Sequence, residues 1–161
     1  MESAVIKAEA RLDVSIAQAR KWFMELETHP ERYPFETHAG FAFVQGNFGE
    51  IGARFQTREQ FYGLKLRLCF ELTDVGDRHF RFRLIRPALP VWGAFVIEEA
   101  PGDNTNLCLE IGGITRPGAW FLRLPLVRDA VQGQIRGEVG HIKASMEAIY
   151  PRKHTNGVKS E

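Results

Sequence analysis

Residues 126–150, LVRDAVQGQIRGEVGHIKASMEAIY, decide the fold that the sequence predicts. Apolar side chains recur there every three or four residues, which places one apolar stripe along a helix. We expect this helix to begin near Leu126, after Pro125, and to end at Tyr150, before Pro151. At about 1.5 Å per residue it would span roughly 35 Å, enough to cross a whole sheet. The stripe consists of Val131, Ile135, Glu138, Val139, Ile142, Met146 and Ile149.

The residues before this helix alternate between apolar and polar side chains, which is the period of a β-strand. The clearest example is LKLRLCFEL at 64–72. Turn signals such as NFGEIG at 47–52 and Gly76-Asp77 separate it from its neighbours. Further strands are expected at 41–44, 55–61, 80–84, 91–98 and 107–111.

One more alternating strand, from Ile6 to Leu12, precedes these, and a short helix follows it. Ser15 opens that helix with a capping box to Gln18, and residues 30–34 leave room for at most a second short helix. A single long helix with one apolar stripe must pack on the concave side of the sheet. The sequence therefore predicts an α+β helix-grip fold in which a seven-stranded curved antiparallel sheet surrounds the C-terminal helix. We expect one domain over residues 1–150 and a disordered tail over 151–161.

Composition excludes several classes of protein. The net charge is +1, and acidic and basic residues are interspersed, which argues against a nucleic-acid-binding domain. Cys69 and Cys108 have no metal-ligand spacing, so reduced thiols and a cytoplasmic location are expected. The longest nearly apolar run, residues 88–97, is too short to span a bilayer.

Two carboxylates stand out because they lie on apolar faces. Glu59 shares a strand face with Phe55, Thr57 and Phe61, and Glu138 lies on the apolar stripe of the long helix. A buried carboxylate is costly unless it is paired, protonated or functional. Glu59 and Glu138 are therefore candidate catalytic residues, as general acid and base. A salt bridge or a solvent-exposed position is the alternative for each of them.

The order of elements resembles the START-like (SRPBCC) superfamily, which includes polyketide cyclases, pollen-allergen-type proteins and lipid-transfer domains. The resemblance rests on SIAQARKWFMELETHPERYP at 15–34, GNFGEIGARFQTRE at 46–59, GGITRPGAWF at 112–121 and HIKASMEAIY at 141–150. It implies a hydrophobic cavity between the concave face and the long helix. The residues expected to line it and bind a ligand are Phe41, Phe43, Phe55, Phe61, Leu66, Leu68, Phe82, Leu107, Ile135 and Ile142.

Three functions follow from this resemblance. The first is binding of a small aromatic or lipid-like ligand without a cofactor, by a monomer or homodimer. The second is a cyclase or hydrolase activity that uses Glu59 and Glu138, and the third is an interaction module without a small ligand. No metal is expected. The alternative is a zinc site like that of the phloretin hydrolase branch, formed here by His38, Glu59, Glu138 and His141, although the helical His and Glu occur in the reverse order.

Overall fold

The computed structural model describes residues 5–34 and 38–152 of the chain, except for the side chain of His38. The elements are β1 (Val5–Leu12), α1 (Ile16–Met24), η1 (Glu25–Glu27), η2 (Pro30–Arg32), β2 (His38–Gln45), β3 (Arg54–Phe61), β4 (Leu64–Val75), β5 (His79–Arg86), β6 (Val91–Ala100), β7 (Asn104–Gly113), α2 (Arg116–Phe121) and α3 (Pro125–Ile149). η1 and η2 are short 3-10 helices.

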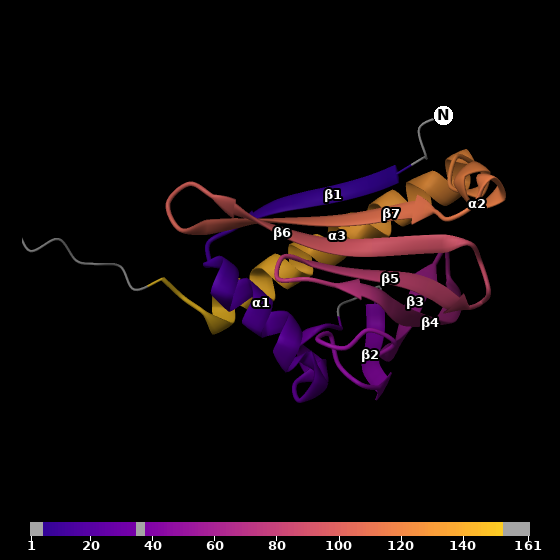
Figure 1. Cartoon of the computed structure of the whole chain (residues 1–161). Coiled ribbons are helices and arrows are strands. Elements are labelled where there is room, and N and C mark those ends of the chain that lie inside the picture. The colour runs from indigo at the N-terminus through magenta and orange to yellow at the C-terminus, as the bar shows by residue number, and fades with distance from the viewer. Residues whose placement is uncertain (1–4, 35–37, 153–161) are drawn as a thin grey trace, which may run out of the picture.

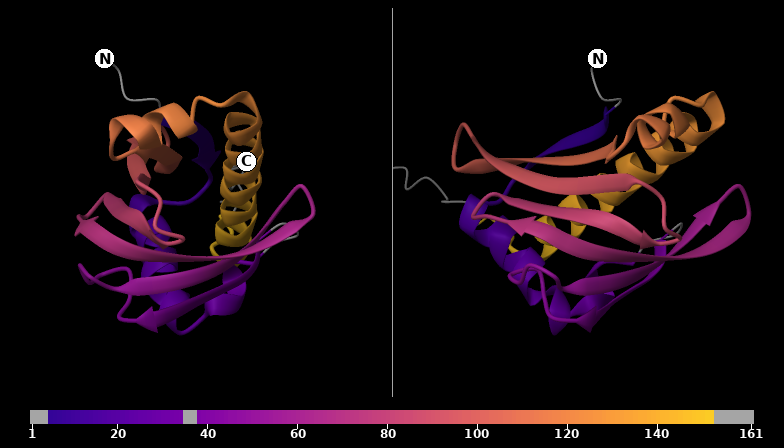
Figure 2. Two further views of the ribbon diagram at one scale, coloured as in Figure 1. Left: turned by 90° about the vertical axis from the view of Figure 1, so that its right-hand side faces the viewer. Right: turned by 45° about the vertical axis from the view of Figure 1, so that its right-hand side comes forward.

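The seven strands form one antiparallel sheet in the order β1-β7-β6-β5-β4-β3-β2. Every pair except β1–β7 joins strands that are consecutive in the sequence, so short turns suffice. The sheet curves around α3, which crosses behind it (Figures 1 and 2). The helix-grip architecture predicted from the period-two segments and the final apolar stripe is confirmed.

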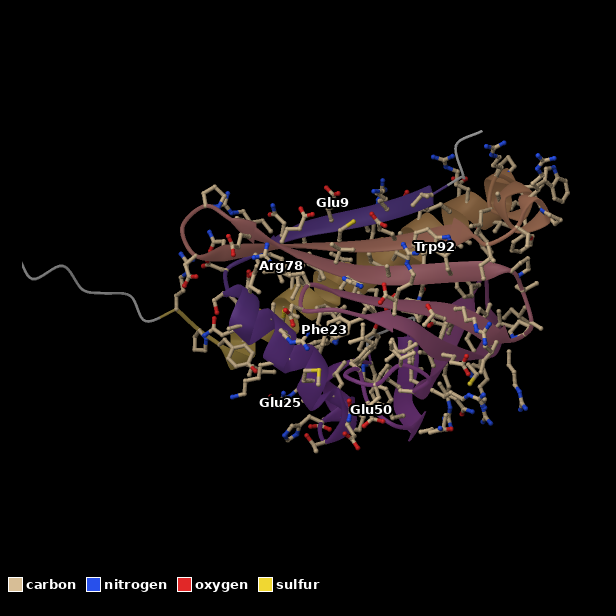
Figure 3. The ribbon with its side chains drawn as sticks, viewed as in Figure 1. Glu9, Phe23, Glu25, Glu50, Arg78 and Trp92 are labelled. Carbon is tan, nitrogen blue, oxygen red and sulfur yellow. The ribbon has the colours of Figure 1, made fainter. Side chains whose placement is uncertain are left out.

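The first helix begins as the sequence predicts. The Ser15 side chain accepts a hydrogen bond from the Gln18 backbone N–H at 3.2 Å, and the Gln18 side chain accepts one from the Ser15 backbone N–H at 2.9 Å. This capping box satisfies two donors that would otherwise lack partners. Phe23 then points from α1 toward the sheet, where its ring lies 5.0 Å from that of Phe95 (Figure 3). The indole N–H of Trp22 donates to Ser145 on α3 at 3.0 Å, which ties the two helices together.

The outer face of the sheet, which points away from α3, is exposed to solvent, as the charged residues in the alternating pattern indicate. Glu71 accepts hydrogen bonds from Arg54 and Arg83 on the two flanking strands, at 3.0 and 2.7 Å. These two bonds lower the pKa of Glu71 below its usual range. On the neighbouring strands, Arg81 lies over the ring of Trp92 at 4.7 Å (Figure 3).

Two details differ from the sequence prediction. A helix, α2, lies between β7 and α3 where only a connection was expected, and α3 starts one residue earlier than predicted. Leu64 belongs to the apolar face of β4 by parity, yet it is 61% exposed because it lies at the tip of the β3–β4 hairpin. No helix in the described part of the chain is both long and apolar enough to cross a bilayer.

Candidate functional site

Aromatic rings cover the concave face of the sheet from β2 to β6. Phe41 and Phe55 lie 5.5 Å apart, Phe55 and Phe82 5.6 Å, and Phe82 and Phe95 5.6 Å, all between ring centroids. Such spacings are typical of favourable edge and offset contacts between rings. These rings form a continuous wall from β2 to β6.

Tyr33 provides a hydroxyl inside this apolar region. Its ring stacks on Phe41 with a centroid separation of 4.5 Å and is 2% exposed. The hydroxyl donates a hydrogen bond to Glu138 on α3, and Glu138 is itself only 9% exposed. Burial, together with the nearby carboxylates of Glu138 and Glu59, raises the pKa of Tyr33 well above its usual value. The phenol therefore remains protonated and serves as a hydrogen-bond donor at neutral pH.

The segment that carries Tyr33 is fixed by two polar contacts. The ring of His141 on α3 makes a 2.9 Å hydrogen bond to the carbonyl oxygen of Arg32, and since a carbonyl only accepts, Nε2 carries the proton. The Arg32 guanidinium donates to Glu25 at 2.8 Å. Both contacts hold η2 against the body of the protein, and they set the position of the Tyr33 ring.

Glu59 lies on the same interior surface as Tyr33. It is 6% exposed, and its carboxylate accepts a hydrogen bond from the side-chain amide of Gln134 on α3. Gln134 precedes Glu138 by one helical turn, so both residues point to the same side of α3. The two carboxylates thus reach the interior from different elements, Glu59 from the sheet and Glu138 from the helix. Both contribute to the raised pKa of Tyr33.

Thr57 is the one buried side chain of the described part of the chain whose polar atom lacks a hydrogen-bond partner. It is 2% exposed and lies between Phe55 and Glu59 on the concave face of β3. Leu68 of β4 and Phe41 of β2 are its neighbours across the sheet. A buried hydroxyl without a partner costs free energy, so this position favours a polar group that enters from outside the chain.

The residues predicted to line a cavity fall into two groups. One group is buried among other side chains and consists of Phe41, Phe55, Phe82, Leu107, Ile135 and Ile142. The other group is half-buried and consists of Phe43, Phe61, Leu66 and Leu68. Leu66 lies directly opposite Glu59 on the neighbouring strand, and Leu68 lies opposite Thr57. The apolar surface accessible from outside therefore adjoins the buried polar groups.

Two hollows that described residues line lie at other places. One of about 350 Å³ lies on the outer face of the sheet, over β1, β6 and β7, where Lys7 pairs with Glu110 at 2.6 Å. Cys108 lines this hollow, and burial raises the pKa of its thiol to about 11. A second hollow lies beside β2. Neither hollow corresponds to the predicted cavity between sheet and helix.

The alternative zinc set is only partly brought together. Glu59 and Glu138 share the interior, but the Nε2–H of His141 is engaged by the Arg32 carbonyl. The side chain of His38 lies outside the described residues, although its backbone pairs with Glu59. Among the side chains that the structure describes, no three His, Cys, Asp or Glu residues form a group that could hold a metal ion.

Sequence reasoning missed the parts played by Tyr33 and Gln134. Nothing in the sequence shows that the Tyr33 hydroxyl reaches a carboxylate 105 positions further along the chain. Gln134 carries a detectable signal, because it precedes Glu138 by four residues and so shares one side of a helix with it. The parity of β3, in contrast, placed Thr57 and Glu59 on the interior face.

No protein-family model matches the chain, and no curated protein sequence matches it. Solved structures do match. An aromatase/cyclase from Streptomyces sp. R1128 has a TM-score of 0.72 at 10% identity, over 98% of this chain and 100% of that one. A protein from Thermus thermophilus has a TM-score of 0.69 at 18% identity, over 91% and 99%. A norcoclaurine synthase mutant from Thalictrum, in complex with a transition-state analogue, has a TM-score of 0.68 at 9% identity, over 92% and 97%.

These matches extend over nearly the whole length of each chain. The protein shares the helix-grip fold of these solved structures, as the sequence predicts. At such low identity the likeness concerns the fold, and the function has to be argued from the residues of this chain.

Proposed function

We propose that the chain binds a small, largely apolar ligand between the concave face of the sheet and α3. The observation that carries this proposal is the Thr57 hydroxyl, which is 2% exposed and has no partner within the described chain. A ligand group at hydrogen-bonding distance from it would remove the cost of burying that hydroxyl. Free thiols at Cys69 and Cys108 are in keeping with a cytosolic location.

The surroundings of Thr57 define the ligand. Glu59 lies two residues further on the same face, and its carboxylate is an acceptor when it is ionised. A ligand hydroxyl can donate to Glu59 and accept from Thr57, since a hydroxyl fills both roles. The apolar part of the ligand would contact Leu66 and Leu68, which are half-buried beside these two groups. We therefore expect an aromatic or lipid-like molecule that carries a hydroxyl group.

A pair of probes tests this assignment. 2-Naphthol and naphthalene differ by one hydroxyl, so a site built as proposed binds 2-naphthol more tightly. Titration calorimetry of both probes against the wild type, Glu59→Gln and Thr57→Val separates apolar contact from polar recognition. We expect both variants to weaken 2-naphthol binding by about tenfold, the equivalent of one hydrogen bond, and to leave naphthalene binding unchanged.

The matched control is Thr105→Val, because Thr105 is also fully buried but already donates to the Val14 carbonyl at 2.8 Å. This variant should bind both probes like the wild type. The proposal fails if neither probe binds and native mass spectrometry of freshly purified protein shows no added mass. Equal affinities for 2-naphthol in all variants would remove Thr57 and Glu59 from the site.

A second candidate function is acid–base catalysis by Glu59 and Glu138. The observation that favours it is that both carboxylates surround one protonated phenol, Tyr33. A carboxylate next to a hydrogen-bond donor in a dry interior can accept a proton while the donor stabilises developing negative charge. Hydrolysis of 4-nitrophenyl butyrate by the wild type, lost in Glu59→Gln with naphthalene binding retained, would support the hydrolase. Turnover that survives in both Glu59→Gln and Glu138→Gln would exclude it.

A further inference from the structure

Exposed apolar side chains gather where α2 meets the start of α3. Ile114, Trp120 and Leu126, which we call the apolar rim, are 54%, 64% and 73% exposed. Water-exposed apolar clusters of this kind mark binding surfaces, whereas single exposed apolar residues need no explanation. Figures 1 and 2 place α2 and the start of α3 at the same end of the molecule as the tip of the β3–β4 hairpin. That tip adds Tyr62 and Leu64, which are 76% and 61% exposed.

The apolar rim stands on a rigid support. Gly118 packs so closely on the loop before β6 that a Cβ there would lie 2.3 Å from the carbonyl oxygen of Pro90. The backbone N–H of Ile114 donates to that same carbonyl at 2.8 Å. Leu122, which directly follows α2, is 2% exposed and belongs to the core. α2 is therefore held against the loop before β6 and against the core, and Trp120 lies on its exposed side.

Arginines are interspersed with the apolar rim. Arg116, Arg123 and Arg128 are exposed, and Asp129 is the only acidic residue between positions 114 and 130. This short segment has a formal charge of +2, from three arginines and one aspartate, whereas the whole chain carries +1. Lys65 and Arg67 add exposed positive charge at the β3–β4 hairpin. Apolar side chains among cations, with a tryptophan at the surface, match the chemistry of an anionic bilayer surface.

We propose that this end of the protein docks on an anionic membrane surface, with Trp120 and Leu126 inserted among the lipid headgroups and Arg116 and Arg128 against the phosphates. A protein partner would bury the apolar rim equally well, but the charge of the segment requires an acidic surface. The docking places the half-buried apolar side chains of the concave face, such as Leu66, at the membrane-facing end. A lipid-like ligand could then pass between bilayer and protein without crossing water.

Vesicle sedimentation tests the proposal with the full chain. We expect binding to phosphatidylcholine vesicles that contain about one third phosphatidylglycerol to exceed binding to pure phosphatidylcholine by at least about tenfold. Trp120→Ala combined with Leu126→Ser should abolish this binding, and Arg116→Gln and Arg128→Gln should each weaken it several-fold. The matched controls are Ile51→Ser, whose side chain is 69% exposed at the β2–β3 turn, and Arg78→Gln, an exposed arginine at the β4–β5 turn, far from α2 (Figure 3). Both controls should bind like the wild type.

Tryptophan fluorescence reports insertion directly. Trp22 is fully buried and Trp92 is half-buried, so Trp120→Phe identifies the source of a blue shift on addition of anionic vesicles. We expect the shift to disappear in Trp120→Phe, while binding persists. Equal binding to neutral and anionic vesicles, or unchanged binding of the Trp120→Ala, Leu126→Ser variant, would overturn the proposal. The proposal would also be overturned if the wild type were a dimer and this variant a monomer, because a second copy of the chain would then cover the apolar rim. The Trp120→Ala, Leu126→Ser variant should still bind 2-naphthol like the wild type when no vesicles are present. Membrane docking is then tested separately from ligand binding.

Discussion

Replacing Thr57 by valine should stabilise the ligand-free protein. Threonine and valine have nearly the same shape, and the Thr57 hydroxyl is 2% exposed without a partner. Burying an unsatisfied hydroxyl costs about 1–3 kcal/mol. Because a methyl group carries no such cost, we expect Thr57→Val to raise the free energy of unfolding by about 1–2 kcal/mol. For a chain of this size that gain corresponds to a rise of roughly 2–8 °C in Tm.

The same substitution at Thr105 should have the opposite sign. Thr105 is fully buried, and its hydroxyl donates to the Val14 carbonyl at 2.8 Å. Thr105→Val removes that hydrogen bond and leaves a buried carbonyl with one partner fewer, at a cost of about 1–3 kcal/mol. Both residues lie in strands, so differences in strand propensity between threonine and valine cancel in the comparison.

Urea denaturation followed by circular dichroism measures both variants against the wild type. The reasoning predicts a separation of about 2–5 kcal/mol between them, with the wild type in between. If Thr57→Val loses as much stability as Thr105→Val, the Thr57 hydroxyl is satisfied in the empty protein, and the argument for a ligand group there fails. Titration with 2-naphthol provides a second check on Thr57→Val. The affinity for 2-naphthol should fall in this variant while the free energy of unfolding rises.

Further expected outcomes concern burial and ionisation. Leu72→Ala, at a position 1% exposed, should lower the free energy of unfolding by about 2–5 kcal/mol, and the half-buried Leu68→Ala by about half as much, both measured in urea. The pKa of Tyr33 is raised in the folded protein, so the unfolded chain ionises this phenol first. Stability should therefore fall above about pH 10, and Tyr33→Phe should lessen that fall. Hydrogen bonds from Arg83 and Arg54 lower the pKa of Glu71, so they stabilise the fold above about pH 4.5 and this stabilisation is lost in acid. The acid-induced decrease in Tm should therefore be smaller in Glu71→Gln than in the wild type.

The elements that sequence predicts well are those with a long, regular period. Ile135, Val139, Ile142 and Met146 repeat at helical spacing, and all four are buried on α3. Parity along β3 is equally informative, because a slip by one residue would bury Arg54 and Arg58. Thr57 and Glu59 were placed on the interior face for this reason.

The features that sequence does not predict are short or depend on distant partners. α2 spans six residues, Arg116–Phe121, and contains Pro117 and Gly118, so no apolar period can develop within it. Its start does carry a signal, since Thr115 is followed two residues later by Pro117, a combination typical of a helix N-terminus. The contact between Tyr33 and Glu138 depends on how η2 and α3 pack, and no local pattern encodes that geometry.

The pairing of β1 with β7 has a consequence for the synthesis of the chain. Lys7 and its partner Glu110 are 103 residues apart, so β1 leaves the ribosome long before the strand that completes its hydrogen bonds. At about 5–20 residues per second, this interval lasts roughly 5–20 s. During that time the β-rich segment from β2 to β6 can form its hairpins, while β1 still presents unpaired backbone groups and the apolar side chains of Ile6 and Leu12. Nascent chains that end before residue 104, where β7 begins, should therefore be the species that most need a chaperone.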